Sequence, residues 1–145
     1  MEIYTIGFTK TTAEHFFGRL KTAGVRRVLD VRLRNDSQLA GFAKARDLPY
    51  FLRELVGAAY EHEPLLAPTP EILDAFKKGK GDWDDYVVDF MELMEQRSIQ
   101  TELEPNDFLT PTALLCSEAT SENCHRRLVV EYLAEYWPGV TAVHL

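Results

Sequence analysis

The sequence predicts a single α/β domain over residues 1–145, folded as a three-layer α/β/α sandwich around a mainly parallel sheet of four to five strands. Short β-rich runs alternate with longer segments whose apolar residues recur at helical spacing. Strands separated by helices pair in parallel, because each helix returns the chain to the same end of the sheet. The length is sufficient for one domain with its own hydrophobic core.

The first two strands enclose a helix. Residues 2–7 alternate and are β-rich, and a helix capped by Thr11 or Thr12 follows to about residue 21. Gly24 suits the left-handed position after a helix, and residues 28–32 form the second strand. This strand–helix–strand unit predicts parallel pairing.

The middle of the chain is mainly helical. Residues 33–47 show no clear period and are expected to form a loop, after which Pro49 opens a short helix over residues 50–56. Residues 60–62 are expected to form a third strand. Thr69 caps a helix to about Lys77, and a longer amphipathic helix begins at Asp82. Residues 101–110 are polar and are expected to form a loop.

The last strands flank the richest stretch of polar chemistry. A buried strand over Thr112–Cys116 is followed by a turn, with Ser121 as the expected N-cap of a helix that runs to about residue 137. Cys124 would then lie in the first helical turn. Pro138 and Gly139 form a turn before a final strand, residues 140–145, that carries His144.

Composition limits the classes of function. A net charge of −7 disfavours general binding to nucleic acid, although basic residues concentrate in residues 1–53. No apolar run approaches the ~18 residues of a membrane span. Two cysteines and an N-terminus without a signal peptide predict a cytoplasmic protein.

Candidate ligand-binding residues follow from the expected sheet, since ligands of such folds bind at the carboxyl ends of the strands. Two arginines, a glycine turn and a helix N-terminus are expected at one edge, where they would hold a small anion such as a nucleotide or phosphoester. Asp30 and Arg32 share one strand face, which also fits a structural ion pair, with Arg126 or Glu118 as further partners. The ligand-binding candidates are Gly7, Thr9, Asp30, Arg32, Cys116 and Arg126.

The catalytic candidates are Cys124, Glu118 and His125. A cysteine in a first helical turn, beside a histidine and an arginine, is expected to react faster with an alkylating agent than Cys116. A small buried hydrophobic role for Cys124 remains open. A redox pair with Cys116, or metal binding that adds His125 and His144, also remains open. No CxxC or HxxxH spacing supports a metal, so no metal ligand and no cofactor are assigned.

Several segments in order resemble the domain of unknown function 488 family. They are Thr5-Ile6-Gly7-Phe8-Thr9, Leu29-Asp30-Val31-Arg32, Ser37-Gln38-Leu39-Ala40-Gly41-Phe42, Leu66-Ala67-Pro68, Leu115-Cys116-Ser117-Glu118, Cys124-His125-Arg126-Arg127 and Val143-His144. The resemblance implies a compact α/β protein of bacterial or archaeal origin with no established reaction. It adds Ser37 to the ligand-binding candidates. Many members have His-Ser where this chain has Phe8 and Thr9.

Three functions stay open at this point. The first is an enzyme or binding protein for a small anionic ligand, with any reaction at the Cys116–Arg127 turn. The second is a nucleic-acid-binding or regulatory module that uses the basic N-terminal third. The third is a thiol redox or metal-binding protein.

Overall fold

Five parallel strands form one sheet in the order β3-β2-β4-β1-β5, in a computed structural model that describes residues 1–36, 40–79 and 81–145. The strands are β1 (Glu2–Ile6), β2 (Arg27–Asp30), β3 (Ala59–His62), β4 (Thr112–Leu115) and β5 (Thr141–His144). The predicted α/β class and parallel sheet are therefore confirmed. Because the strands are parallel, they all end at one side, the carboxyl edge.

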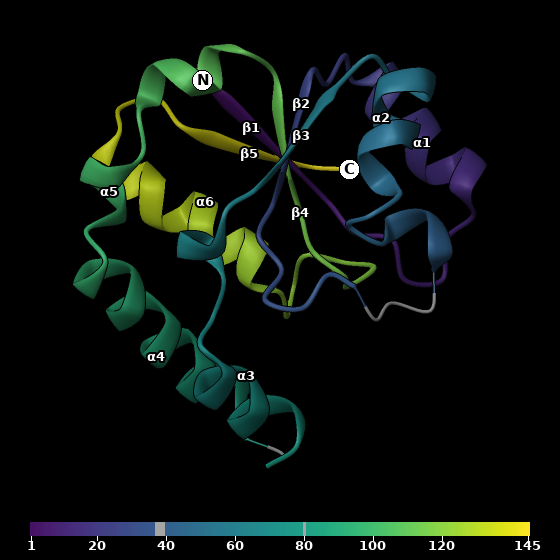
Figure 1. Cartoon of the computed structure of the whole chain (residues 1–145). Helices are drawn as coiled ribbons and strands as arrows, with labels where there is room; N and C mark the ends of the chain where they lie inside the picture. Colours follow the sequence, from purple (N-terminus) through teal and green to yellow (C-terminus); the bar gives the residue numbers. More distant parts are fainter. Residues whose placement is uncertain (37–39, 80) are drawn as a thin grey trace.

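Helices cover both faces of the sheet (Figure 1). Helices α1 (Ala13–Thr22) and α2 (Leu48–Leu55) lie on one side, and α6 (His125–Tyr136) lies on the other with α4 (Trp83–Gln96) packed against it. Helix α3 (Pro70–Lys77) packs on α4 and extends with it beyond the sheet, while α5 (Ile99–Glu102) is a single short turn near α6. Two hydrophobic clusters result, one under each helical layer.

Most of the predicted helix starts are confirmed, and capping residues lie at them. The hydroxyls of Thr12 and Thr69 accept hydrogen bonds from backbone N–H groups three residues later, and the Asp82 carboxylate accepts one from Asp84. Pro49 lies in the first turn of α2. Gly24 has φ +72° after α1, as its position predicted.

Two loop predictions are wrong in part. Residues 101–110 contain the end of α5 and a 3₁₀-helix over Pro105–Leu109, because Phe108 is buried and anchors this segment to the core. The segment from 33 to 47 includes a 3₁₀-helix over Gly41–Ala43, since Ala43 is also buried. Single buried residues in polar surroundings give no periodic pattern from which a helix can be read.

The predicted start of the last helix is also wrong. Helix α6 begins at His125, and its N-cap is Cys124 rather than Ser121, with extended backbone and no side-chain capping bond. The backbone N–H of Cys124 donates to the Ser121 carbonyl, so residues 121–124 form a turn that precedes the helix. Cys124 therefore lies just outside the first helical turn, and His125 opens the helix.

No helix in residues 1–36, 40–79 and 81–145 has both the length and the apolar character that crossing a membrane requires.

Candidate functional site

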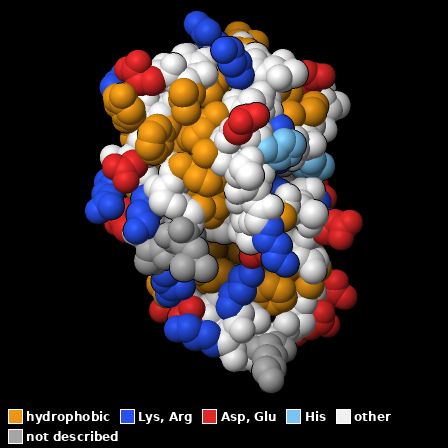
Figure 2. Space-filling view, turned by 90° about the vertical axis from the view of Figure 1, so that its right-hand side faces the viewer, with side chains coloured by type: hydrophobic (Ala, Val, Ile, Leu, Met, Phe, Trp, Pro, Cys, Tyr) orange, Lys and Arg blue, Asp and Glu red, His pale blue; other side chains and the backbone are white. Residues whose placement is uncertain are grey.

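A cavity of ≈ 280 Å³ lies at the carboxyl edge of the sheet, between the ends of β2 and β4 and helix α3. Basic side chains gather around a hollow on the face seen in Figure 2. The cavity wall combines sulfur, imidazole, basic and aromatic groups. Its lining includes Arg32, Arg34, Asp74, Phe76, Lys77, Lys78, Trp83, Tyr86, Cys116, Ser117, Glu118, Asn123, Cys124 and His125.

Arg32 follows β2 and forms a buried ion pair with Asp30. Its Nε and Nη2 donate to the two carboxylate oxygens at 2.9 and 2.8 Å. The Tyr60 hydroxyl, from β3, donates to the same carboxylate at 2.6 Å. The structural pair predicted for Asp30 and Arg32 is confirmed, whereas neither Arg126 nor the Glu118 side chain takes part in it.

The remaining nitrogen of Arg32, Nη1, is buried and has no hydrogen-bond partner within the described parts of the chain. Arg32 is only 2% exposed, and its guanidinium lies over the Phe8 ring at 5.2 Å. A guanidinium that binds Asp30 through one edge keeps its other edge for a second partner. Arg32 can thus serve the ion pair and the cavity together.

Cys116 directly follows the strand β4 and lies beside His125. The Cys116 sulfur and His125 Nδ1 are 3.6 Å apart, and His125 Nε2 is 2.6 Å from the Val31 carbonyl oxygen. Because a carbonyl only accepts, Nε2 must carry a proton, so in the neutral ring Nδ1 presents a lone pair to the sulfur. The Val31 carbonyl therefore fixes both the tautomer and the direction of the imidazole.

Arg126 is 1% exposed and has no carboxylate partner among the residues that the structure describes. Its Nη1 donates to the Glu118 carbonyl at 2.6 Å and lies 3.7 Å from the Cys124 sulfur. A buried cation is costly without compensation. Because no carboxylate among the described residues pairs with Arg126, its positive charge makes the surroundings of the sulfurs electropositive.

The two thiols respond to this environment in opposite directions. The pKa of Cys116 is lowered, first by its hydrogen bond with Cys124 and then, against the effect of burial, by Arg126 and the backbone N–H groups of Ser117 and Glu118. Burial raises the pKa of Cys124 well above its ordinary value, and the neighbouring Cys116 adds to this. The faster alkylation expected of Cys124 assumed that this residue lies in the first helical turn, and that placement is wrong because Cys124 is the N-cap of α6. The order of alkylation itself stays a prediction.

The glycine turn after β1 does not form part of the cavity lining. The N–H groups of Phe8 and Thr9 both donate to the Ser117 carbonyl, and the Thr9 hydroxyl donates to the same oxygen at 2.6 Å. These groups are not available to cradle a phosphate. A Cβ at Gly7 would overlap the Glu118 carbonyl and lie 2.7 Å from Arg126 Nη1, so glycine is required for this close approach.

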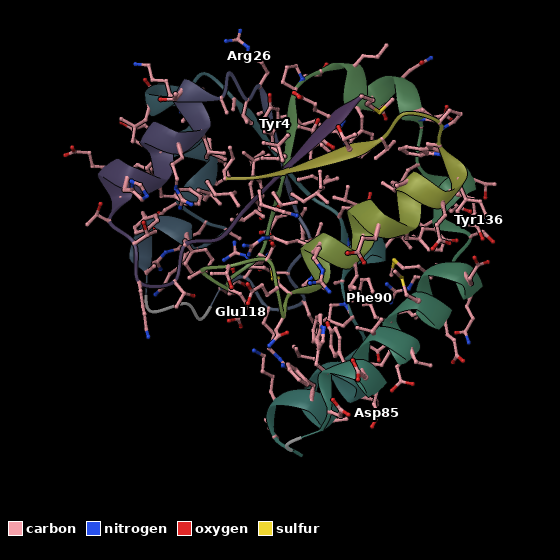
Figure 3. All side chains as sticks on the ribbon, turned by 180° about the vertical axis from the view of Figure 1, so that it is seen from behind. Tyr4, Arg26, Asp85, Phe90, Glu118 and Tyr136 are labelled. Carbon is pink, nitrogen blue, oxygen red and sulfur yellow. The ribbon has the colours of Figure 1, made fainter. Side chains whose placement is uncertain are left out.

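The other predicted residues divide between cavity and surroundings. Arg32, Cys116, Glu118, Cys124 and His125 line the cavity, whereas Gly7, Thr9, Asp30 and Arg126 are not among its lining residues. Glu118 extends from the β4–α6 connection (Figure 3), and its side chain pairs with Lys77 at 2.7 Å. His144 bonds to Thr5, away from the sulfurs. Ser37 falls outside the described residues.

Sequence reasoning missed the far wall of the cavity, which comes from α3 and the start of α4. Phe76, Trp83 and Tyr86 form a run of ring contacts there, and Lys77 and Lys78 end α3. Phe90 continues the aromatic run and contacts the His125 ring at 5.5 Å, between α4 and α6 (Figure 3). In the sequence these aromatic residues fit the apolar faces of ordinary helices. Only the adjacent Lys77 and Lys78 could have indicated a binding site there.

One family model, described as "Domain of unknown function DUF488", matches residues 12–133 of this chain. No curated protein and no solved structure matches the chain significantly. The match includes the cavity residues contributed by β2, α3, β4 and α6. The chain belongs to the DUF488 family.

Proposed function

We propose that the cavity binds a small anionic ligand, such as a phosphoester or a mononucleotide. The proposal rests on Arg32, which lines the cavity. Asp30 holds one edge of its guanidinium, and the buried Nη1 has no hydrogen-bond partner among the described residues. A buried donor that lacks a partner is unfavourable, and an oxygen of a bound anion would satisfy it.

The charge of the rim supports the same class of ligand. Among the residues that the structure describes, four basic and two acidic side chains line the cavity: Arg32, Arg34, Lys77 and Lys78 against Asp74 and Glu118. Lys77 and Glu118 form an ion pair although they are 47% and 42% exposed. Such exposed pairs contribute only about 0–1 kcal/mol, so an entering anion can draw Lys77 away at small cost.

The size and the aromatic wall favour a ligand with a flat apolar part beside its anionic group. Trp83 and Tyr86 stack at 5.0 Å with an interplanar angle of 14°, and Phe76 packs against both rings. All three rings line the same cavity as Cys116 and His125. A nucleobase fits such a wall, which is why we place mononucleotides with simple phosphoesters in the proposed class.

Any reaction of the bound anion would fall to the sulfur and imidazole groups on the Cys116 side. Cys116, Cys124 and His125 have protons or lone pairs to exchange, and all three line the cavity. Glu118 would act on the ligand only after release from Lys77, since its carboxylate is held there at 2.7 Å. These assignments retain the Cys116–Arg127 turn as the reacting segment.

Thermal unfolding with inorganic phosphate and with adenosine monophosphate tests the proposal. We expect the melting temperature to rise with ligand concentration, because binding to the folded state adds about 2.7 kcal/mol at a hundredfold excess over Kd. Arg32→Lys should reduce this rise by removing the planar fork while the charge stays. Arg53→Lys is the matched control, since Arg53 is exposed and pairs with Glu54. Absence of any shift, or an equal shift in Arg32→Lys, would contradict the proposal.

The nucleic-acid alternative has a distinct signature. Binding to a phosphate backbone weakens steeply with salt, with a slope of about −0.9 for each contacted phosphate on duplex DNA. The net charge of −7 disfavours it. Fluorescence anisotropy of a labelled oligonucleotide over a series of salt concentrations should show no saturable binding. Saturable binding with a steep slope would favour the nucleic-acid module over the small ligand.

A further inference from the structure

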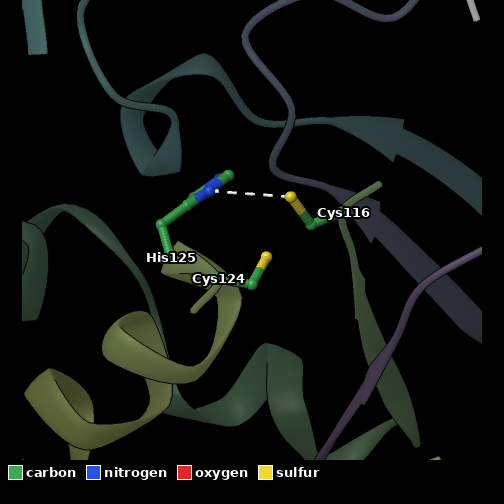
Figure 4. Close-up of side chains that lie close together, drawn as sticks. All are labelled: Cys116, Cys124 and His125. Atoms are coloured by element: carbon green, nitrogen blue, oxygen red, sulfur yellow. Dashed lines mark hydrogen bonds between the residues drawn. The ribbon is translucent and has the colours of Figure 1, made fainter. Parts of the chain in front are cut away.

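We propose that Cys116, Cys124 and His125 form a binding site for a zinc ion. The two sulfurs and the imidazole Nδ1 all lie within 4.8 Å of one another, and the three side chains converge on one point between β4 and the start of α6 (Figure 4). This inference goes beyond anion binding and does not depend on it. The sequence spacing gave no such site, because Cys116 meets the other two only through the fold.

The distances suit a tetrahedral ion. With Zn–S near 2.3 Å and Zn–N near 2.0 Å, two tetrahedral ligands are separated by about 3.5 Å for a sulfur–nitrogen pair and about 3.8 Å for two sulfurs. The Cys116 sulfur and His125 Nδ1 are 3.6 Å apart. The sulfur–sulfur distance is at most 4.8 Å, so small rotations of the cysteine side chains are sufficient to complete the geometry.

The surrounding groups are those that metal ligands require. A metal-binding histidine usually donates its second ring N–H to a carbonyl or carboxylate, and His125 Nε2 lies 2.6 Å from the Val31 carbonyl. Arg126 Nη1 approaches the Cys124 sulfur at 3.7 Å, and its positive charge would stabilise thiolates in a site whose three side chains are buried.

The three ligand side chains indicate which metal would bind and that one coordination position would stay open. Two thiolates and one imidazole are ligands that zinc prefers, while magnesium and calcium need oxygen ligands. Three protein ligands leave the fourth tetrahedral position for water or substrate, as in catalytic rather than structural zinc sites. All three ligands line the cavity that Arg32 also lines, so the fourth position has access to the cavity. An oxygen of the bound anion is the ligand that this position would take.

Cobalt(II) substitution is the experiment that tests the site. The reduced full-length chain, treated with a chelator and then titrated with Co²⁺, should develop a thiolate-to-cobalt charge-transfer band that added Zn²⁺ abolishes. Cys124→Ser and His125→Gln should each weaken cobalt binding by more than the roughly 10–100-fold expected for loss of an outer-shell partner. His144→Gln is the control, because His144 bonds to Thr5 and lies outside the cluster. A band that forms in Cys124→Ser with the same cobalt affinity as in the wild type would overturn the proposal.

Native mass spectrometry of the unmodified chain makes the test independent of whether the variants fold. We expect a single zinc ion per chain after addition of Zn²⁺ and removal of the excess. The absence of a zinc adduct in the reduced wild type would overturn the proposal. The cobalt and zinc experiments contain no phosphate or nucleotide, so failure of the anion site and failure of the metal site are distinguishable.

Discussion

The two buried arginines of this fold have opposite electrostatic environments. Arg32, after β2, is paired with a carboxylate two residues away, and a tyrosine hydroxyl supports that carboxylate from β3. Arg126, in the first turn of α6, has a backbone carbonyl and a cysteine sulfur as its partners, and no carboxylate in the described residues. Both side chains are equally inaccessible, at 2% and 1% exposure.

The difference lies in how each positive charge is compensated. At Arg32 the carboxylate of Asp30 balances the charge, and one buried guanidinium nitrogen has no partner among the described residues. At Arg126 no carboxylate in the described residues cancels the positive charge, and this charge contributes to lowering the pKa of Cys116. We therefore expect substitutions around the two arginines to have different effects.

Removing the carboxylate beside Arg32 should have the largest effect on stability. Asp30→Asn leaves a buried guanidinium without its counter-charge, and breaking a buried pair in this way costs about 3–5 kcal/mol. Arg126→Met is the matched substitution, because it leaves no unpaired side-chain charge and loses mainly the bond to the Glu118 carbonyl, at about 1–3 kcal/mol. Urea denaturation gives both values. Equal costs would show that the two arginines do not differ as described.

Filling the space beside Arg126 should have the next largest effect. Gly7→Ala places a methyl group against the Glu118 carbonyl and Arg126 Nη1, and we expect a loss of about 1–3 kcal/mol from overpacking. Gly18→Ala, in α1 with open space around it, should be neutral or stabilising. Thermal denaturation of both variants checks this. A Gly7→Ala protein as stable as wild type would contradict the close approach of these segments.

Weakening the support of Asp30 should have a smaller effect. Tyr60→Phe removes the 2.6 Å hydrogen bond to the carboxylate but leaves the ion pair intact. A hydrogen bond to a charged group contributes about 1.5–3 kcal/mol, and the half-buried position of Tyr60 favours the lower end. Tyr50→Phe, on an exposed face of α2, is the control. A loss as large as that of Asp30→Asn would mean that the tyrosine, not the arginine, holds the carboxylate.

Opening the rim of the cavity should have the smallest effect on stability. Lys77→Ala removes the exposed pair with Glu118, which contributes about 0–1 kcal/mol. The same change should lower the affinity for phosphate, because it removes one of the basic residues of the cavity lining. Calorimetric titration separates the two quantities. Unchanged affinity would exclude Lys77 from the anion site.

Part of the fold and of the candidate site could be predicted from the sequence. The sequence predicted a strand that holds both Asp30 and Arg32, and the alternation of side chains along it predicted their pairing. The pair forms, although β2 ends at Asp30 and Arg32 follows it. The parallel sheet and most helices followed from periodicity and capping residues. The common location of Arg32, Cys116 and Cys124 followed from the rule that parallel strands end at one edge.

The rest of the site depends on contacts that the sequence cannot express. The distance between Cys116 and His125 depends on how α6 approaches β4, and the N-cap moved from Ser121 to Cys124 because the intervening turn closes on its own backbone. The phosphate cradle expected at Gly7 and Thr9 is absent because the Ser117 carbonyl already accepts from that turn. The aromatic residues of α3 and α4 reach the cavity only through tertiary packing.

Crystals grown with tungstate would show whether an anion binds beside Arg32. Tungstate has the shape and charge of a phosphate analogue and gives an anomalous signal that locates it without bias. We expect one peak inside the cavity, within hydrogen-bonding distance of Arg32 and on the side of Cys116 and His125. A peak only at the exposed lysines of α3, or no peak in a crystal that contains tungstate, would contradict anion binding beside Arg32.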